Sequence, residues 1–96
     1  MIISKTERTL SMREFVYKLT DENGLHARPA GLFVKAASQF SSEITVSTEK
    51  KSANGKKIFS VMQLGAKCGD LLKVQIDGSD EEVAAASLEK FLKENL

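Results

Sequence analysis

Alternation of apolar and polar side chains predicts four β-strands in this chain. Apolar residues recur at every second position in 13–19, 44–48 and 72–77, which is typical of strands with one face buried. A polar turn after the second strand leads into a short return strand at 52–54, so these two strands are expected to form a hairpin. The glycine-containing turn at 21–24 ends the first strand.

Three other segments have the spacing of amphipathic helices. The first begins near Ala27, accommodates Pro29 in its first turn, and has an apolar stripe made of Leu32, Ala36 and Phe40, with Phe33 and Ala37 beside it. The second spans about two turns, with Ile58, Val61 and Met62 recurring at helical spacing before Gly65 ends it.

The last helix has the clearest start signal. Ser79 followed by Glu82 predicts a capping box, in which the two side chains bond each other's backbone amides. The side expected to face the core carries Val83, Ser87, Leu88, Phe91 and Leu92. The order β-α-β-β-α-β-α predicts an α+β fold, an open-faced two-layer sandwich with a four-stranded antiparallel sheet covered on one face by three helices.

Composition narrows the functional class. The 96 residues suffice for one domain, and 14 basic against 13 acidic side chains argue against a nucleic-acid partner. The single cysteine, Cys68, fits a reducing cytoplasm and makes a metal site improbable. No apolar run reaches the length of a membrane span, so membrane insertion is not expected. We expect residues 1–11 to be a flexible N-terminal extension and residues 12–96 to form the domain.

The chain's single histidine is the best candidate for chemistry. His26 stands between a turn and a helix, where unpaired backbone N–H groups favour an anion. Arg28 adds a planar cationic fork beside it, which suits a phosphate. The residues therefore predict that His26 accepts a phosphoryl group and that Arg28 and the helix end hold it. Asn23 and Gly24 either form only the turn or also contribute to the site.

A second feature is apolar. Ile58 and Phe59 are adjacent in a short helix, so both cannot face the core. Phe59 is therefore expected at the surface, either as a scattered apolar residue or, with Ile58 and Met62, in a docking patch. From the residues alone the scattered position is favoured.

Several motifs together resemble the HPr family, the histidine phosphocarriers of the bacterial phosphoenolpyruvate-dependent sugar phosphotransferase system. The resemblance covers residues 12–96 and rests on the stretches 24–30, 51–54 and 58–65 and on the helix start at 78–81. It implies a carrier without cofactor or metal that is not a turnover enzyme. It also implies that phosphorylated enzyme I donates the phosphoryl group and that IIA domains of sugar permeases accept it.

The resemblance assigns roles to individual residues. It implies phosphorylation of His26 at Nδ1, contact of Arg28 with the phosphate, and a phosphate site lined by Ala27 and the following amides, with Asn23 close by. It also implies that Ile58, Phe59 and Met62 dock both partners, which reverses the preference drawn from the residues alone.

One departure from the family and two alternatives bear on the partners. Lys57 occupies the usual place of a regulatory serine, so HPr kinase is not expected to act on this chain. A phosphocarrier of a regulatory branch, nitrogen-related or of a dihydroxyacetone kinase system, would use the same chemistry with another acceptor. A module that only binds anions without a covalent step is the third possibility.

Overall fold

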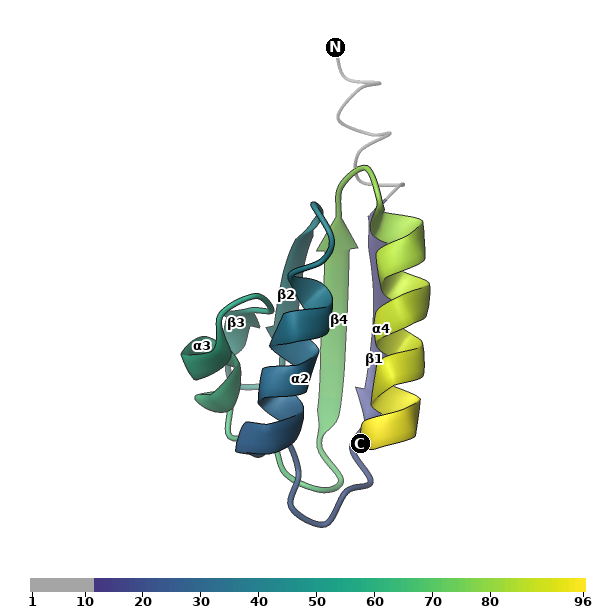
Figure 1. Cartoon of the computed structure of the whole chain (residues 1–96). Helices are drawn as coiled ribbons and strands as arrows, with labels where there is room; N and C mark the ends of the chain where they lie inside the picture. The colour runs from purple at the N-terminus through teal and green to yellow at the C-terminus, as the bar shows by residue number, and fades with distance from the viewer. Residues whose placement is uncertain (1–11) are drawn as a thin grey trace.

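Strands and helices follow each other in the predicted order. The computed structural model describes residues 12–96, so the expectation for residues 1–11 lies outside the described residues. The elements are β1 (Arg13–Lys18), α2 (Ala27–Ala37), β2 (Glu43–Ser47), β3 (Ser52–Asn54), α3 (Ile58–Met62), β4 (Leu71–Asp77) and α4 (Glu81–Asn95) (Figure 1). The α+β class and the element order predicted from the hydrophobic pattern are confirmed.

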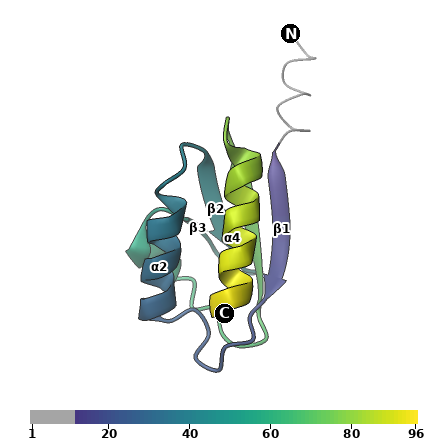
Figure 2. The same ribbon diagram turned by 45° about the vertical axis from the view of Figure 1, so that its right-hand side comes forward.

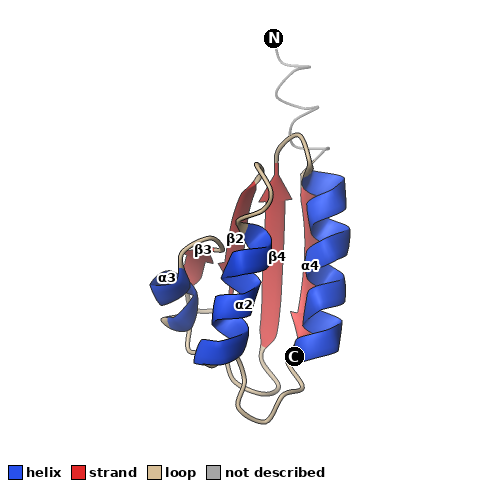
Figure 3. Ribbon diagram, in the orientation of Figure 1, coloured by secondary structure: helices blue, strands red, loops and turns tan. Residues whose placement is uncertain are grey.

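The four strands form one antiparallel sheet in the order β1-β4-β2-β3. β4 is central: Val74 pairs with Phe15 of β1 and with Val46 of β2. The inward side chains of β4 are buried, whereas Lys73 on the other face is exposed. All three helices lie on the same face of the sheet, so the open-faced sandwich is also confirmed (Figures 2 and 3).

Helix α2 turns a different side to the core than its sequence predicts. Ala30, Phe33 and Ala37 are buried, whereas Leu32 is 43% exposed. The ring of Phe33 packs edge-on against Phe91 of α4, with 6.0 Å between the ring centroids. This contact between helices selects the Phe33 side of α2, and the predicted stripe centred on Leu32 is wrong by about one position.

In α4 the predicted inner side is covered only in part. Its buried residues include Ala84, Leu88 and Leu92, whereas Val83 and Ser87 of the predicted inner side are exposed. Phe91 is partly buried against α2. The predicted inner side is therefore confirmed at Leu88, Phe91 and Leu92 and wrong at Val83 and Ser87, because the positions of the sheet and α2 decide where the covered side of the helix ends.

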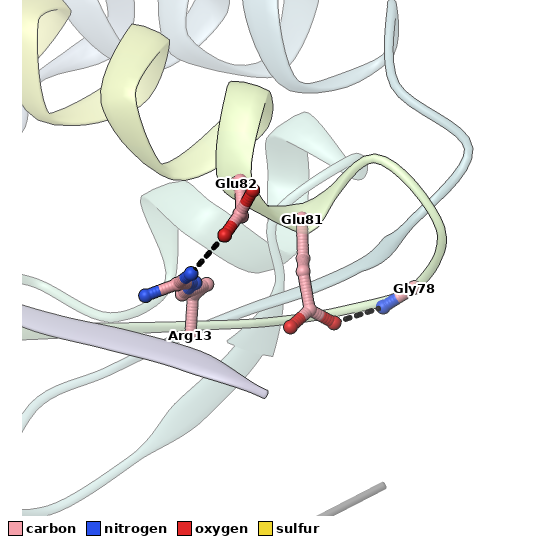
Figure 4. A network of polar contacts seen from close by, with 4 residues as sticks. All are labelled: Arg13, Gly78, Glu81 and Glu82. Carbon is pink, nitrogen blue, oxygen red and sulfur yellow. Dashed lines mark hydrogen bonds and ion pairs between the residues drawn. The ribbon is translucent and has the colours of Figure 1, made fainter. Parts of the chain in front are cut away.

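The predicted capping box between Ser79 and Glu82 is wrong. Asp80 is the N-cap, and its carboxylate accepts hydrogen bonds from the amides of Ser41 (2.8 Å) and Ser42 (3.0 Å) and from the Ser42 hydroxyl. Glu82 pairs instead with Arg13, and Glu81 accepts the Gly78 amide at 3.0 Å (Figure 4). The Ser42 hydroxyl and then the Ser41 amide lower the pKa of Asp80 to about 2.

Candidate functional site

His26 lies where the loop from β1 enters α2. It is the N-cap of the helix, with extended backbone at φ −87° and ψ −177°, and its side chain makes no capping hydrogen bond. The residue is exposed. The ring is therefore accessible from solvent at the start of a helix, as the sequence predicted.

The first turn of α2 has backbone donors without an acceptor inside the helix. Helix geometry leaves the amides of Ala27 and Arg28 without an intrahelical partner, and Pro29 has no N–H. The first bonded amide is that of Ala30, which donates to the His26 carbonyl at 3.0 Å. The first turn contains no acidic residue. Together these features make the start of α2 a positive site that no carboxylate of its first turn occupies.

Arg28 adds the side-chain charge that the sequence predicted. It is exposed and forms no ion pair with any residue in 12–96. A shallow hollow of about 330 Å³ brings it together with His26 and Asn23, and is lined by Asp21, Asn23, His26, Arg28, Pro29, Leu32 and Asn95. Asn95 comes from the far end of the chain and gave no signal in the sequence. Only the fold brings the end of α4 to this hollow.

The loop before His26 is tightly packed on a second loop. The Leu25 amide donates to the Ala66 carbonyl at 3.0 Å, and Leu25 itself is buried. Gly24 has φ +64°, and a Cβ added there would lie 2.5 Å from the Ala66 oxygen. Glycine is therefore required by both conformation and space. Asn23 forms part of the turn through its amide, which donates to Asp21 Oδ1 at 2.8 Å.

Beside this site, four apolar side chains are exposed on α2 and α3. Phe59 is 76% exposed, and Ile58 and Met62 are each more than a third exposed; Leu32 of α2 completes what we call the apolar patch. The two helices are in close contact, since a Cβ at Gly31 would lie 3.3 Å from Ile58 Cδ1. The exposure expected for Phe59 is confirmed. Leu32 was missed because its spacing assigned it to the core.

Other sequence features do not join this site. Lys57 is the N-cap of α3 and is exposed, without a side-chain capping bond. The exposed Cys68 thiol donates to the Thr20 carbonyl at 3.6 Å. Within residues 12–96 no cluster of His, Cys, Asp or Glu has the arrangement needed for a metal ion, and none of the helices there could cross a membrane.

Comparison with known proteins identifies the class. Residues 13–94 match the family described as "PTS HPr component phosphorylation site". The phosphocarrier protein HPr of Buchnera aphidicola is 47% identical over 75 residues, which are 78% of this chain and 88% of that protein. HPr of Borreliella burgdorferi is 44% identical over 74% of this chain and 83% of its own length. The crystal structure of an HPr from Thermoanaerobacter tengcongensis superposes with a TM-score of 0.81 at 40% identity, covering 85% of this chain and 92% of that one.

These matches, with the sheet and the three helices described above, define a small phosphocarrier and not an enzyme that turns over by itself. The chain belongs to the HPr family of the phosphotransferase system. Its function is that of the family: it takes a phosphoryl group from phosphorylated enzyme I in the cytoplasm and passes it to IIA domains.

Proposed function

We propose that His26 is the residue that carries the phosphoryl group. The observation that supports this most strongly is its place as the exposed N-cap of α2, next to amides without an acceptor inside the helix. In the proposed step the lone pair of His26 Nδ1 attacks phosphorus, and the bond from phosphorus to the donor breaks as the new P–N bond forms. The reverse exchange then transfers the group to the acceptor.

The surroundings of His26 suit a group that must be both held and released. The amides of Ala27 and Arg28 and the Arg28 guanidinium offer donors to phosphate oxygens. Two unit charges 4 Å apart attract each other by about 1 kcal/mol in water and about 4 kcal/mol at a partly screened surface. Because Arg28 is exposed, its contribution lies toward the lower value. Pro29 removes a third amide, so the phosphate is stabilised only moderately. We assign Asn23 to the rim of this site.

The test of this assignment is phosphorylation by enzyme I and phosphoenolpyruvate. The wild-type chain is expected to gain one acid-labile phosphate, detected by intact mass, and His26→Ala to gain none because it lacks the accepting nitrogen. Phosphate or sulfate binding by His26→Ala, followed by nuclear magnetic resonance, would show that the anion site persists without covalent chemistry. An acid-stable product on serine, or an unmodified wild type with active enzyme I, would contradict the proposal.

We further assign the apolar patch (Leu32, Ile58, Phe59 and Met62) to docking of both enzyme I and IIA domains. Its support is the exposure of four large apolar side chains on two helices in contact with each other, next to the hollow that contains His26. One patch used in turn by donor and acceptor suits small, rapidly exchanging interfaces.

Phe59→Ala tests the docking assignment. Enzyme I should show a KM for this variant raised by about tenfold, the effect typical of an aromatic interface residue. The free energy of unfolding should change by less than about 0.5 kcal/mol, because the side chain is exposed. Val83→Ala is the matched control, since Val83 is an exposed apolar residue on α4. A large loss of thermal stability in Phe59→Ala, or equal KM values for the two variants, would refute the assignment.

The partners do not include HPr kinase in this proposal. The ammonium of Lys57 cannot take the place of a serine hydroxyl as phosphate acceptor, and Lys57 is the N-cap of α3.

A further inference from the structure

The loop that carries His26 is fastened to the end of α4 at a single atom. Three donors converge on one main-chain oxygen of Leu96: the amides of Thr20 (2.7 Å) and Asp21 (2.9 Å) and the Thr20 hydroxyl (2.9 Å). Leu96 is itself fixed, because its side chain is 4% exposed and its amide donates to Leu92 at 2.8 Å. The start of the loop is therefore tied to a rigid point on the core.

From that point a short chain of hydrogen bonds leads to His26. The carbonyl of Asp21 accepts the Gly24 amide at 2.9 Å, and the Gly24 carbonyl accepts the His26 amide at 3.0 Å. Gly24 packs so closely against the backbone of Ala66 and Lys67 that there is no room beside it for a side chain. We therefore expect a shift of the backbone at Thr20 to be transmitted to His26.

The end of α4 also contributes to the hollow around His26. Asn95 lines it together with Asp21, His26 and Arg28. Asn95, next to Leu96, thus forms one wall of the site, while the main-chain oxygen of Leu96 holds the loop that forms another. Both walls depend on the same junction between Thr20 and Leu96.

We propose that Thr20 is a positioning residue for phosphoryl transfer: its hydroxyl and amide bind the main-chain oxygen of Leu96 and so fix the loop in the place where the His26 ring meets the donor. This inference rests on the assignment of His26 as the phosphorylated residue. In this proposal Thr20 acts only through the backbone of residues 20–26. Loss of the Thr20 hydroxyl is expected to slow the transfer step without changing how partners bind the apolar patch.

The test is Thr20→Val, which keeps the shape of the side chain and removes the hydroxyl donor. With enzyme I and phosphoenolpyruvate, kcat for phosphorylation is expected to fall by about fivefold, the scale of a small misplacement of a reacting group, while KM stays at the wild-type value. Thr20→Ser retains the hydroxyl and should restore most of kcat. Amide hydrogen exchange of Gly24 and His26 should accelerate in Thr20→Val only.

Ser42→Ala is the control for simple destabilisation. It removes a buried hydroxyl that donates to Asp80, and it does so without altering a hydrogen bond of the His26 loop. If Thr20→Val transfers phosphate at the wild-type rate, or loses no more kcat than Ser42→Ala, or is not restored by serine, the positioning role is overturned. A wild-type chain that gains no phosphate would instead overturn the assignment of His26, so the two failures can be distinguished.

Discussion

His26 is the N-cap of α2 and Asp80 is the N-cap of α4, and the two helix starts differ in the charges that surround their backbone amides. α4 has Glu81 and Glu82 in its first turn, and Asp80 before it bonds the Ser41–Ser42 segment. Its acidic start lies in a network with Arg13 and Gly78 (Figure 4). α2 has a histidine before it, an arginine inside it and no acidic residue. The comparison shows that the proposed anion site is the helix start whose own first turn contains no carboxylate, with Asp21 of the preceding loop on the wall of the same hollow.

The strongest way to break this contrast is to give α2 a carboxylate. Ala27→Glu puts one at the first, exposed position of the helix, where it should occupy the amides and repel a phosphate. Phosphorylation by enzyme I is expected to fall by about a hundredfold, within the range reported for loss of a preorganised anion site. The free energy of unfolding should rise by about 0.3–1 kcal/mol, because an acidic residue suits a helix start.

Ala27→Gln introduces a side chain of the same size as Glu but without its charge. The difference between the two variants therefore measures the electrostatic part of the loss in transfer rate. It should lose much less transfer rate than Ala27→Glu when both are assayed with enzyme I. Equal rates for the two variants would mean that bulk and not charge closes the site. Thermal denaturation of both variants measures whether the carboxylate stabilises the helix.

The next effect concerns the start of α4. Because the pKa of Asp80 is lowered from 3.8 to about 2 in the folded protein, its ionised form stabilises the fold above about pH 4. That stabilisation is lost as the pH falls through about 2. Asp80→Asn should therefore melt at a lower temperature than wild type at pH 7, and the difference should shrink between pH 4 and pH 2. A constant difference across that range would contradict the role of the charge.

The smallest expected effect is that of the ion pair between Arg13 and Glu82. The two side chains are 50% and 74% exposed, and exposed pairs contribute about 0–1 kcal/mol. Arg13→Gln should therefore lower the free energy of unfolding by less than about 1 kcal/mol and leave phosphoryl transfer unchanged. Salt titration gives an independent measure, since added salt should remove most of the difference between the variant and wild type.

The contrast also explains which parts of the molecule could be predicted from sequence. The strands, the helices and the place of His26 follow from local periodicity and from residues next to each other in the chain. The hydrogen-bond partners of Asp80 could not be predicted in this way. Ser41 and Ser42 lie 39 and 38 residues away in the sequence, and only the fold brings them next to Asp80. Local spacing therefore favoured Ser79 and Glu82, and the choice among three consecutive acidic residues was made by tertiary contacts.

The site shows the same division. His26 and Arg28 could be predicted as a pair because their chemistry is local to one helix start. Leu32 was assigned to the core and Asn95 was not considered, since their places depend on how α2 turns against α4 and on where α4 ends. The role of Thr20 could not be read from its neighbours, because Leu96 is 76 residues away.

The close contact between Gly31 and Ile58 has a consequence for recognition. α3 is a helix of five residues and is too short to be stable by itself, so its position depends on the contact with α2. His26 is the residue immediately before α2. The apolar patch that we propose for docking and the His26 ring that we propose as the phosphate acceptor therefore lie on two elements that contact each other. In the proposed function, a donor or an acceptor that binds the apolar patch is therefore placed at the same distance from the His26 ring.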